Sequence, residues 1–149
     1  MYITTAQQAN DWFAFANSDR RIFEMGKTRF EAVGKLVMRL QEENLLTGVD
    51  LVELERRRQI EQEGWSAEHD SRHRHGELAQ AAACYALESV KESAGFDLYQ
   101  AQIDEIVSLW WPFEVDAWKP KDQMRDLIRA GALIAAEIDR LLQLTGEKK

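Results

Sequence analysis

The chain has 149 residues, 45% of them hydrophobic and 30% charged, which is typical of one globular domain rather than of a disordered chain. Its formal net charge of −7 excludes duplex nucleic acid as an expected partner, because neutralising phosphates requires a basic face. No apolar run approaches the roughly 18 residues of a membrane span, and the start lacks a secretory signal, so we expect a cytoplasmic protein without a membrane partner.

Helix signals recur along the first fifty residues, whereas alternating β-branched runs with hairpin turns are absent. Thr5 and Gln8 have the spacing of a capping box, which predicts a helix that continues through Phe15. A second helix is predicted over residues 27–46, with Gly48 after its end. The expected buried face of this second helix consists of Phe30, Val33, Val37 and Leu40.

Four further helices are predicted in the remaining hundred residues. One opens at Asp50 and ends at Gly64, one covers about 71–93, and one begins at Asp97. The last runs over about 122–144 and has the clearest amphipathic stripe in the chain. We therefore predict an all-α, single-domain helical bundle of about five or six helices that folds as one unit. Residues 1–49 would form an N-terminal helical arm, and residues 50–149 the core that carries the functional site.

The segment from Trp65 to Glu77 contains all three histidines of the chain. If it is helical, Asp70, His73 and Glu77 share one face, and His69 lies one turn before His73. Nitrogen and oxygen ligands at this spacing suit a divalent metal ion such as Mg²⁺, Mn²⁺ or Zn²⁺, bound by His69, Asp70, His73 and Glu77. Alternatively His73 and Glu77 form a catalytic acid–base pair. A third interpretation is an exposed or capping row without a function.

A second unusual stretch, residues 109–120, holds four aromatic residues between or beside two prolines. Trp110 and Trp111 favour a packing role, whereas Trp118 with Lys119 could equally form a stacking surface for a base or another planar group. Arg125 and Arg129 follow this stretch one turn apart, and they could hold a phosphate or pair with Glu77. The predicted ligand-binding residues are therefore Trp65, His69, Asp70, Trp118, Lys119 and Arg125.

Charged residues elsewhere favour simpler interpretations. Arg56, Arg57 and Arg58 alternate with glutamates, which favours a solvated helix face over a site for a small anion. In the last helix, Glu137 interrupts the apolar stripe and is expected to point inward, whereas surface salt bridges are expected for Asp139 and Arg140.

These motifs resemble a family of small proteins from bacteriophages and prophages. The resemblance covers about residues 53–142 and implies a phage origin, with the host cytoplasm as the location, but little chemistry. The motifs that carry it are Glu55-Arg56, Arg58-Gln59, Glu63-Gly64-Trp65, Glu68-His69-Asp70, His73, Gly76-Glu77-Leu78-Ala79, Trp118-Lys119-Pro120 and Arg125.

A weaker similarity links the chain to MazG-like, all-α nucleoside triphosphate pyrophosphohydrolases. It rests on Arg56, Arg58-Gln59, Trp65, His69-Asp70 and Gly76-Glu77-Leu78-Ala79. This similarity implies a metal-dependent nucleotide hydrolase. The family's magnesium site needs a pair of acids one turn apart on a helix, and here Arg74 occupies the position of the partner of Glu77.

Three functions follow as hypotheses. The first is a helical protein that binds, or also hydrolyses, a nucleotide or a similar anionic ligand through the His/Asp/Glu cluster. The second is an accessory protein that binds and modulates a host protein without catalysis, using aromatic anchors. The third is a structural homo-oligomer in which the polar row only caps and bridges helices.

Overall fold

The computed structural model describes residues 3–16, 22–43, 45–91 and 97–146 of the chain. These residues form helices and a small antiparallel sheet, in two compact units of residues 1–50 and 51–149. The prediction of an all-α fold is wrong, because three strands lie in the first unit, where a helix was expected. Folding of the whole chain as one unit stays a prediction.

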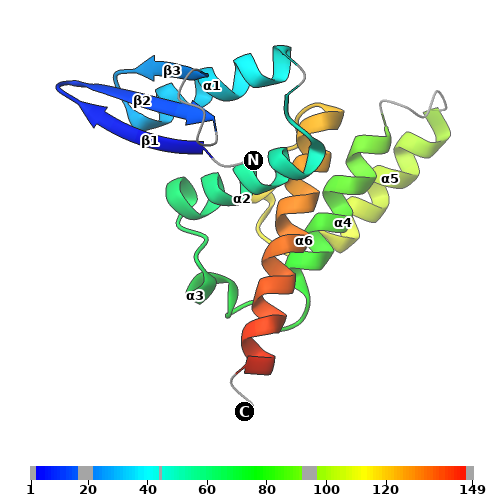
Figure 1. The fold of residues 1–149 in the computed structure, drawn as a ribbon. Coiled ribbons are helices and arrows are strands. Elements are labelled where there is room, and N and C mark those ends of the chain that lie inside the picture. The colour runs from blue at the N-terminus through cyan, green and yellow to red at the C-terminus, as the bar shows by residue number, and fades with distance from the viewer. Residues whose placement is uncertain (1–2, 17–21, 44, 92–96, 147–149) are drawn as a thin grey trace. The chain divides into compact units, whose positions relative to one another are not determined.

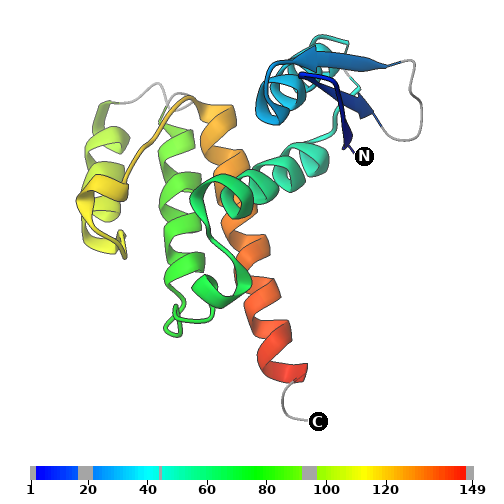
Figure 2. The same ribbon diagram turned by 90° about the vertical axis from the view of Figure 1, so that its left-hand side faces the viewer.

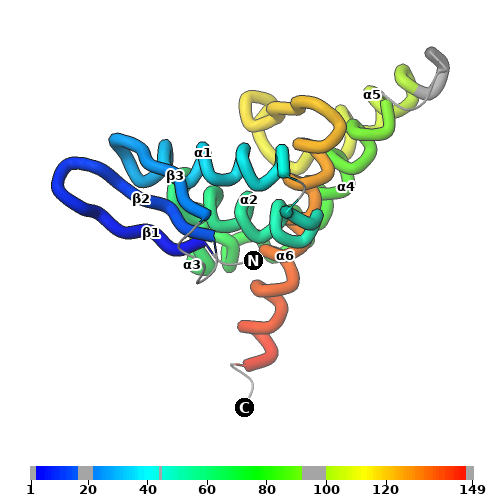
Figure 3. The backbone as a smooth tube through the Cα atoms, turned by 45° about the horizontal axis from the view of Figure 1, so that its top comes forward, coloured from blue at the N-terminus to red at the C-terminus, as the bar shows by residue number. Residues whose placement is uncertain are grey.

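The first unit begins with three antiparallel strands in the order β1-β2-β3: β1 (Ile3–Gln8), β2 (Asp11–Ala16) and β3 (Phe23–Gly26) (Figures 1 and 3). A tight turn at residues 9–10 joins β1 to β2, and Ala9 in this turn has a φ of 53°. Trp12, Ala14 and Ala16 alternate along β2 and belong to the core of this unit. This period of two residues is that of a strand, and it outweighs the local capping signal of Thr5.

Helix α1 (Arg29–Glu42) follows the sheet, and the hydroxyl of Thr28 caps it by accepting a hydrogen bond from the Glu31 N–H at 3.1 Å. The helix itself was predicted, but its buried face was predicted only in part. Leu40 is buried as expected, whereas Phe30 is 48% exposed. The residues of α1 that pack with the sheet are Ala32, Leu36 and Leu40.

The second unit is helical. Its elements are α2 (Gly48–Glu63), α3 (Ala67–Asp70), α4 (Glu77–Val90), α5 (Asp97–Trp110), the 3₁₀ turn η1 (Val115–Ala117) and α6 (Gln123–Gly146). Helix α4 lies between α5 and α6 (Figure 2). No helix in the described part of the chain is long and apolar enough to cross a membrane.

Small residues allow the helices of the second unit to approach closely. Alanines and leucines of α4 and α6 meet in its main core, with Tyr85 at one end. Gly131 of α6 faces α2, and a Cβ atom at this position would lie only 2.6 Å from Cγ2 of Val52. The core residues shared by α4 and α6 are Leu78, Ala81, Ala82, Tyr85, Ala130, Leu133 and Ala136.

The segment with the three histidines is not one continuous helix. After the single turn α3, residues 71–76 form turns, and α4 begins only at Glu77. Gly76 has a φ of 83°, a left-handed conformation that glycine adopts without strain. Asp70, His73 and Glu77 therefore do not share a helix face, which corrects the predicted start of this helix near residue 71.

Candidate functional site

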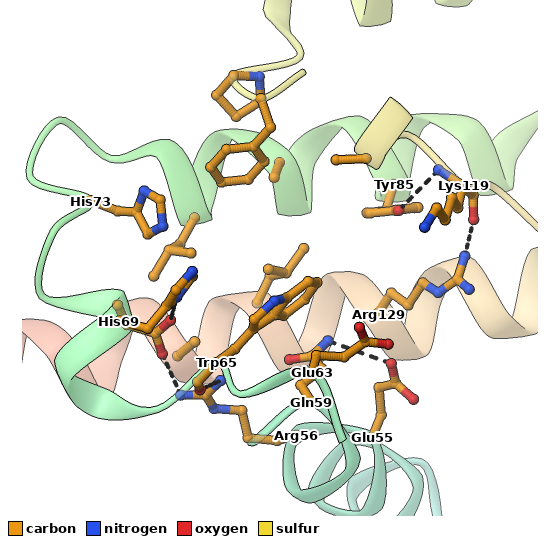
Figure 4. A pocket seen from close by; sticks show the side chains of 18 of the residues that line it. Glu55, Arg56, Gln59, Glu63, Trp65, His69, His73, Tyr85, Lys119 and Arg129 are labelled. Carbon is orange, nitrogen blue, oxygen red and sulfur yellow. Dashed lines mark hydrogen bonds and ion pairs between the residues drawn. The ribbon is translucent and has the colours of Figure 1, made fainter. Parts of the chain in front are cut away.

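A cavity of about 610 Å³ lies in the second unit between α2, α4, α6 and residues 111–119 (Figure 4). This volume falls within the range of pockets that hold small molecules. Leu78 and Ala81 of α4 and Leu133 and Ala136 of α6 contribute apolar surface, and α2 contributes mainly charged and polar side chains. The cavity is thus a mixed site with an apolar wall and a polar wall.

Trp65 is fixed in the cavity wall by its own backbone. Helix α2 stops at Gly64, which has a φ of 75°, and the chain then reverses. The Trp65 N–H donates to the carbonyl of Gln59 at 3.1 Å, and the Trp65 carbonyl accepts from Arg56 Nη1 at 3.2 Å. Both backbone groups of Trp65 are therefore tied to α2, which holds its indole ring at the cavity.

Asp70 connects α3 to α2. Its side chain is 3% exposed, and its Oδ2 accepts from Arg56 Nη2 at 2.5 Å. Its Oδ1 lies 3.1 Å from His69 Nδ1. Because both carboxylate oxygens already have partners, Asp70 positions Arg56 and His69 at the cavity wall.

Aromatic rings follow one another along the cavity. Neighbouring centroids in this series lie 5.1–6.4 Å apart, and the rings of Trp65 and His69 are nearly parallel, at 13°. Such separations are typical of attractive aromatic pairs. In order, the rings belong to Trp65, His69, His73, Phe113, Trp111 and Tyr85, which we call the aromatic arc.

Glu55 is the buried acid of the polar wall that α2 forms. Its side chain is 2% exposed and accepts two hydrogen bonds of 2.9 Å from Arg58, and Arg125 Nη2 lies 3.7 Å away. Burial opposes ionisation of Glu55, but the hydrogen bonds from Arg58 and the charges of Arg125 and Arg129 outweigh it and lower the pKa. Glu55 is therefore a carboxylate surrounded by arginines.

Lys119 and Arg129 add positive charge at the same end of the cavity. Arg129 Nη1 donates to the Lys119 carbonyl and to Asp126 Oδ1, the latter at 3.4 Å, and the guanidinium lies 5.5 Å from the centre of the Tyr85 ring. The Lys119 N–H donates to the Tyr85 hydroxyl at 3.4 Å. Among the described residues, no acidic side chain pairs with the Lys119 ammonium group, which leaves it available to an anion.

Of the predicted site residues, five line this cavity and three do not. Those that line it are Trp65, His69, Asp70, His73 and Lys119. The Glu77 carboxylate instead accepts from the His75 N–H at 2.7 Å, at the start of α4. Trp118 packs on Tyr85 and Trp111, with ring centroids 4.7 Å from each. Arg125 is close to Glu55 but has a side chain that is 46% exposed.

The predicted metal site is not assembled in the described part of the chain. No group of three or more His, Cys, Asp or Glu side chains is placed there to hold a metal ion. His69, Asp70 and His73 do come together, but the Glu77 carboxylate is engaged with the backbone of His75. Metal binding and a catalytic role for His73 and Glu77 stay predictions.

The sequence interpretation missed the contribution of α2. Arg56 was placed on a solvated helix face, which is wrong, because its side chain is only 11% exposed and pairs with Asp70. Gln59 is 1% exposed. Glu55 and Gln59 lie one turn apart on α2, beside Arg56. This spacing was the signal in the sequence that these polar side chains share one side of the helix.

The predictions for two charged residues of α6 had different outcomes. Glu137 is buried, which confirms that it points inward. Arg140 is also buried, at 6% exposed, so the predicted surface salt bridge is wrong. The two side chains pair through hydrogen bonds of 2.9 and 2.7 Å inside the protein.

Comparison of the chain with protein-family models, with curated protein sequences and with solved structures gives no match. The resemblances to a phage protein family and to MazG-like hydrolases therefore stay predictions.

Proposed function

We propose that this protein binds a planar, anionic small molecule of the nucleotide type in the cavity of its second unit. The observation that carries the proposal is the division of the cavity into two ends. The rings of Trp65, His69 and His73 lie toward one end. Arg58, Lys119 and Arg129 lie toward the other end, where the aromatic arc finishes at Tyr85. A ligand with a flat ring and a phosphate or carboxylate has the same division.

The aromatic end supports binding of a ring. Trp65 is held through both of its backbone groups, so little conformational freedom is lost when a planar group stacks on it. Stacking of a base on an aromatic side chain contributes about 1–3 kcal/mol. The edge-on arrangement of His73 and Phe113 adds a second apolar surface at this end.

The charged end supports binding of an anion. The charge of Arg58 is balanced by Glu55 and Glu63, and Arg129 makes one long contact to Asp126. Lys119 adds a cation without an acidic partner among the described side chains. Ammonium and guanidinium groups are the usual ligands of phosphate in proteins.

Binding is better supported than hydrolysis. Asp70, the most buried acid near the histidines, already pairs with Arg56 and His69. Glu77 is not among the residues that line the cavity. The described acids thus offer no free pair for a metal ion or for activating water, so we limit the proposal to binding.

Isothermal titration and tryptophan fluorescence with nucleoside mono- and triphosphates, with and without Mg²⁺ or Mn²⁺, test this proposal. We expect Trp65→Ala to weaken binding about tenfold or more, since 1.4 kcal/mol corresponds to a factor of ten. Trp110→Ala is the matched control, because Trp110 is 55% exposed and does not line the cavity. If no nucleotide binds at millimolar concentration, or if both variants behave alike, the proposal is wrong.

A protein-binding role is a second candidate, favoured by an exposed apolar face on α6. Ile134, Ile138 and Leu141 recur at helical spacing and are 44–51% exposed. Size-exclusion chromatography with light scattering on the wild type and on Ile138→Glu tests whether this face joins copies of the chain. If the wild type and Ile138→Glu are both monomers, the partner of this face is a different protein. Pull-down with the same two variants then tests for that partner.

A further inference from the structure

We propose that the Gln59 carboxamide recognises the hydrogen-bonding edge of the ligand's ring, so that the ligand class is a nucleobase derivative rather than a plain aromatic acid. This inference rests on the proposed function. It assigns to Gln59 the choice between bases, whereas Trp65 and Lys119 recognise the ring face and the anion.

Gln59 has a hydrogen-bond acceptor without a partner. Gln59 lines the cavity and is 1% exposed, and no hydrogen bond from the described residues reaches its Oε1 atom. Buried polar side-chain atoms in native proteins almost always have a partner. A buried amide oxygen without one, in the wall of a cavity, indicates a partner that arrives with the ligand.

Glu55 determines which end of the Gln59 amide is free. Gln59 Nε2 donates to Glu55 Oε1 at 3.5 Å. Glu55 is held as a carboxylate by Arg58, and an ionised carboxylate only accepts hydrogen bonds. The amide nitrogen must therefore face Glu55, which leaves the oxygen as the atom that the ring edge meets.

Arg56 provides a donor without a partner next to Gln59. Arg56 lies three residues before Gln59 on the same side of α2 and also lines the cavity. Its Nη1 and Nη2 are engaged with Trp65 and Asp70, whereas its buried Nε has no partner among the described residues. An unpaired donor and an unpaired acceptor thus lie in one wall, near Trp65 (Figure 4).

This pair of groups complements a ring that carries a donor and an acceptor on one edge. Nucleobases have such edges, and benzoate-like or indole-like acids lack this combination. Both protein atoms are shielded from water, so contact requires a small shift of the Arg56 side chain and a small rotation of the Gln59 amide. Its terminal torsion has a broad minimum, and only the long 3.5 Å bond to Glu55 opposes the rotation.

The test measures affinity for AMP, GMP, CMP, UMP and ribose 5-phosphate by isothermal titration. We expect the wild-type protein to separate the four nucleotides by about tenfold or more, since the energy of a single hydrogen bond to a buried group is of this size. Gln59→Met keeps the length of the side chain but removes the amide. It should reduce the spread to less than about threefold and leave ribose 5-phosphate binding unchanged.

Gln62→Met is the matched control, because Gln62 lies on the same helix but is exposed and does not line the cavity. It should retain the full preference among bases. If Gln59→Met does not fold, as judged by circular dichroism, Gln59→Leu replaces it. That variant also removes the amide oxygen, so it should likewise reduce the spread among the four nucleotides to less than about threefold.

Equal affinity of the wild type for all four nucleotides overturns this inference. The proposed function still holds in that case if Trp65→Ala weakens the binding of these nucleotides. A uniform loss in Gln59→Met, including ribose 5-phosphate, overturns it as well, because the role of Gln59 would then be structural. If no nucleotide binds at all, the proposed function and this inference are both wrong.

Discussion

Replacing Asp70 with alanine removes one half of a buried ion pair. The Arg56 and Asp70 side chains are 11% and 3% exposed, and the variant leaves the guanidinium of Arg56 in a site with little water. Removing one partner of a buried pair typically costs about 3–5 kcal/mol. Arg56 keeps its hydrogen bond to the Trp65 carbonyl, so we expect a loss near the lower value, about 3 kcal/mol.

Urea denaturation followed by tryptophan fluorescence measures this loss, and calorimetry should show a melting temperature lower by about 6–12 °C. The control is Glu68→Ala. Glu68 is paired with Arg72 at 3.8 Å, and the side chains of Glu68 and Arg72 are 87% and 72% exposed. We expect this control to change the stability by less than about 0.5 kcal/mol.

A double-mutant cycle separates the pair from the packing around it. Arg56→Met and Asp70→Leu should each destabilise the protein, and the double variant should recover at least about 2 kcal/mol of the summed loss. A loss below about 1 kcal/mol in Asp70→Ala, or additive effects in the cycle, would show that α3 is not held by this pair.

Two further predictions concern α2. Gly131→Ala places a Cβ atom 2.6 Å from Cγ2 of Val52, so we expect the free energy of unfolding, measured by urea denaturation, to fall by about 1–3 kcal/mol. Adding Val52→Ala should restore most of this loss. An unchanged urea midpoint in Gly131→Ala would contradict the close approach of α2 and α6. Because the folded-state pKa of Glu55 is lowered, its contribution to stability is present above the ordinary glutamate pKa of about 4.3 and is lost as the pH falls through the folded value. Glu55→Gln should therefore lose less stability than the wild type on acidification below about pH 4.3, and parallel curves contradict this assignment.

The first unit shows why local signals were insufficient for the fold. Thr5 and Gln8 have the spacing of a helix cap, but the chain pairs residues 3–8 with residues 11–16 as strands. Pairing with β3 and packing against α1 then bury Ala14 and Ala16 completely or nearly so. A short capping signal contributes about 1 kcal/mol, and burial of a sheet face against a helix contributes more.

The candidate site divides in a similar way. The sequence drew attention to Trp65, His69, Asp70, His73 and Lys119, because histidines and tryptophans concentrated in two short segments are unusual, and all five line the cavity. It did not indicate that Arg56 pairs with Asp70, 14 residues later, because that contact depends on the reversal of the chain at Gly64.

The sequence by itself determined the local features of this protein. Helix α2 ends at Gly64 because glycine accepts a left-handed conformation, and α6 forms where apolar residues recur with helical spacing. The tertiary structure decided which charged side chains became part of a cavity and which stayed in solvent. Glu55, Gln59 and Arg56 lie in the cavity wall because α2 packs beside Gly131 of α6, and the burial of a polar group depends on neighbours that are distant in the sequence.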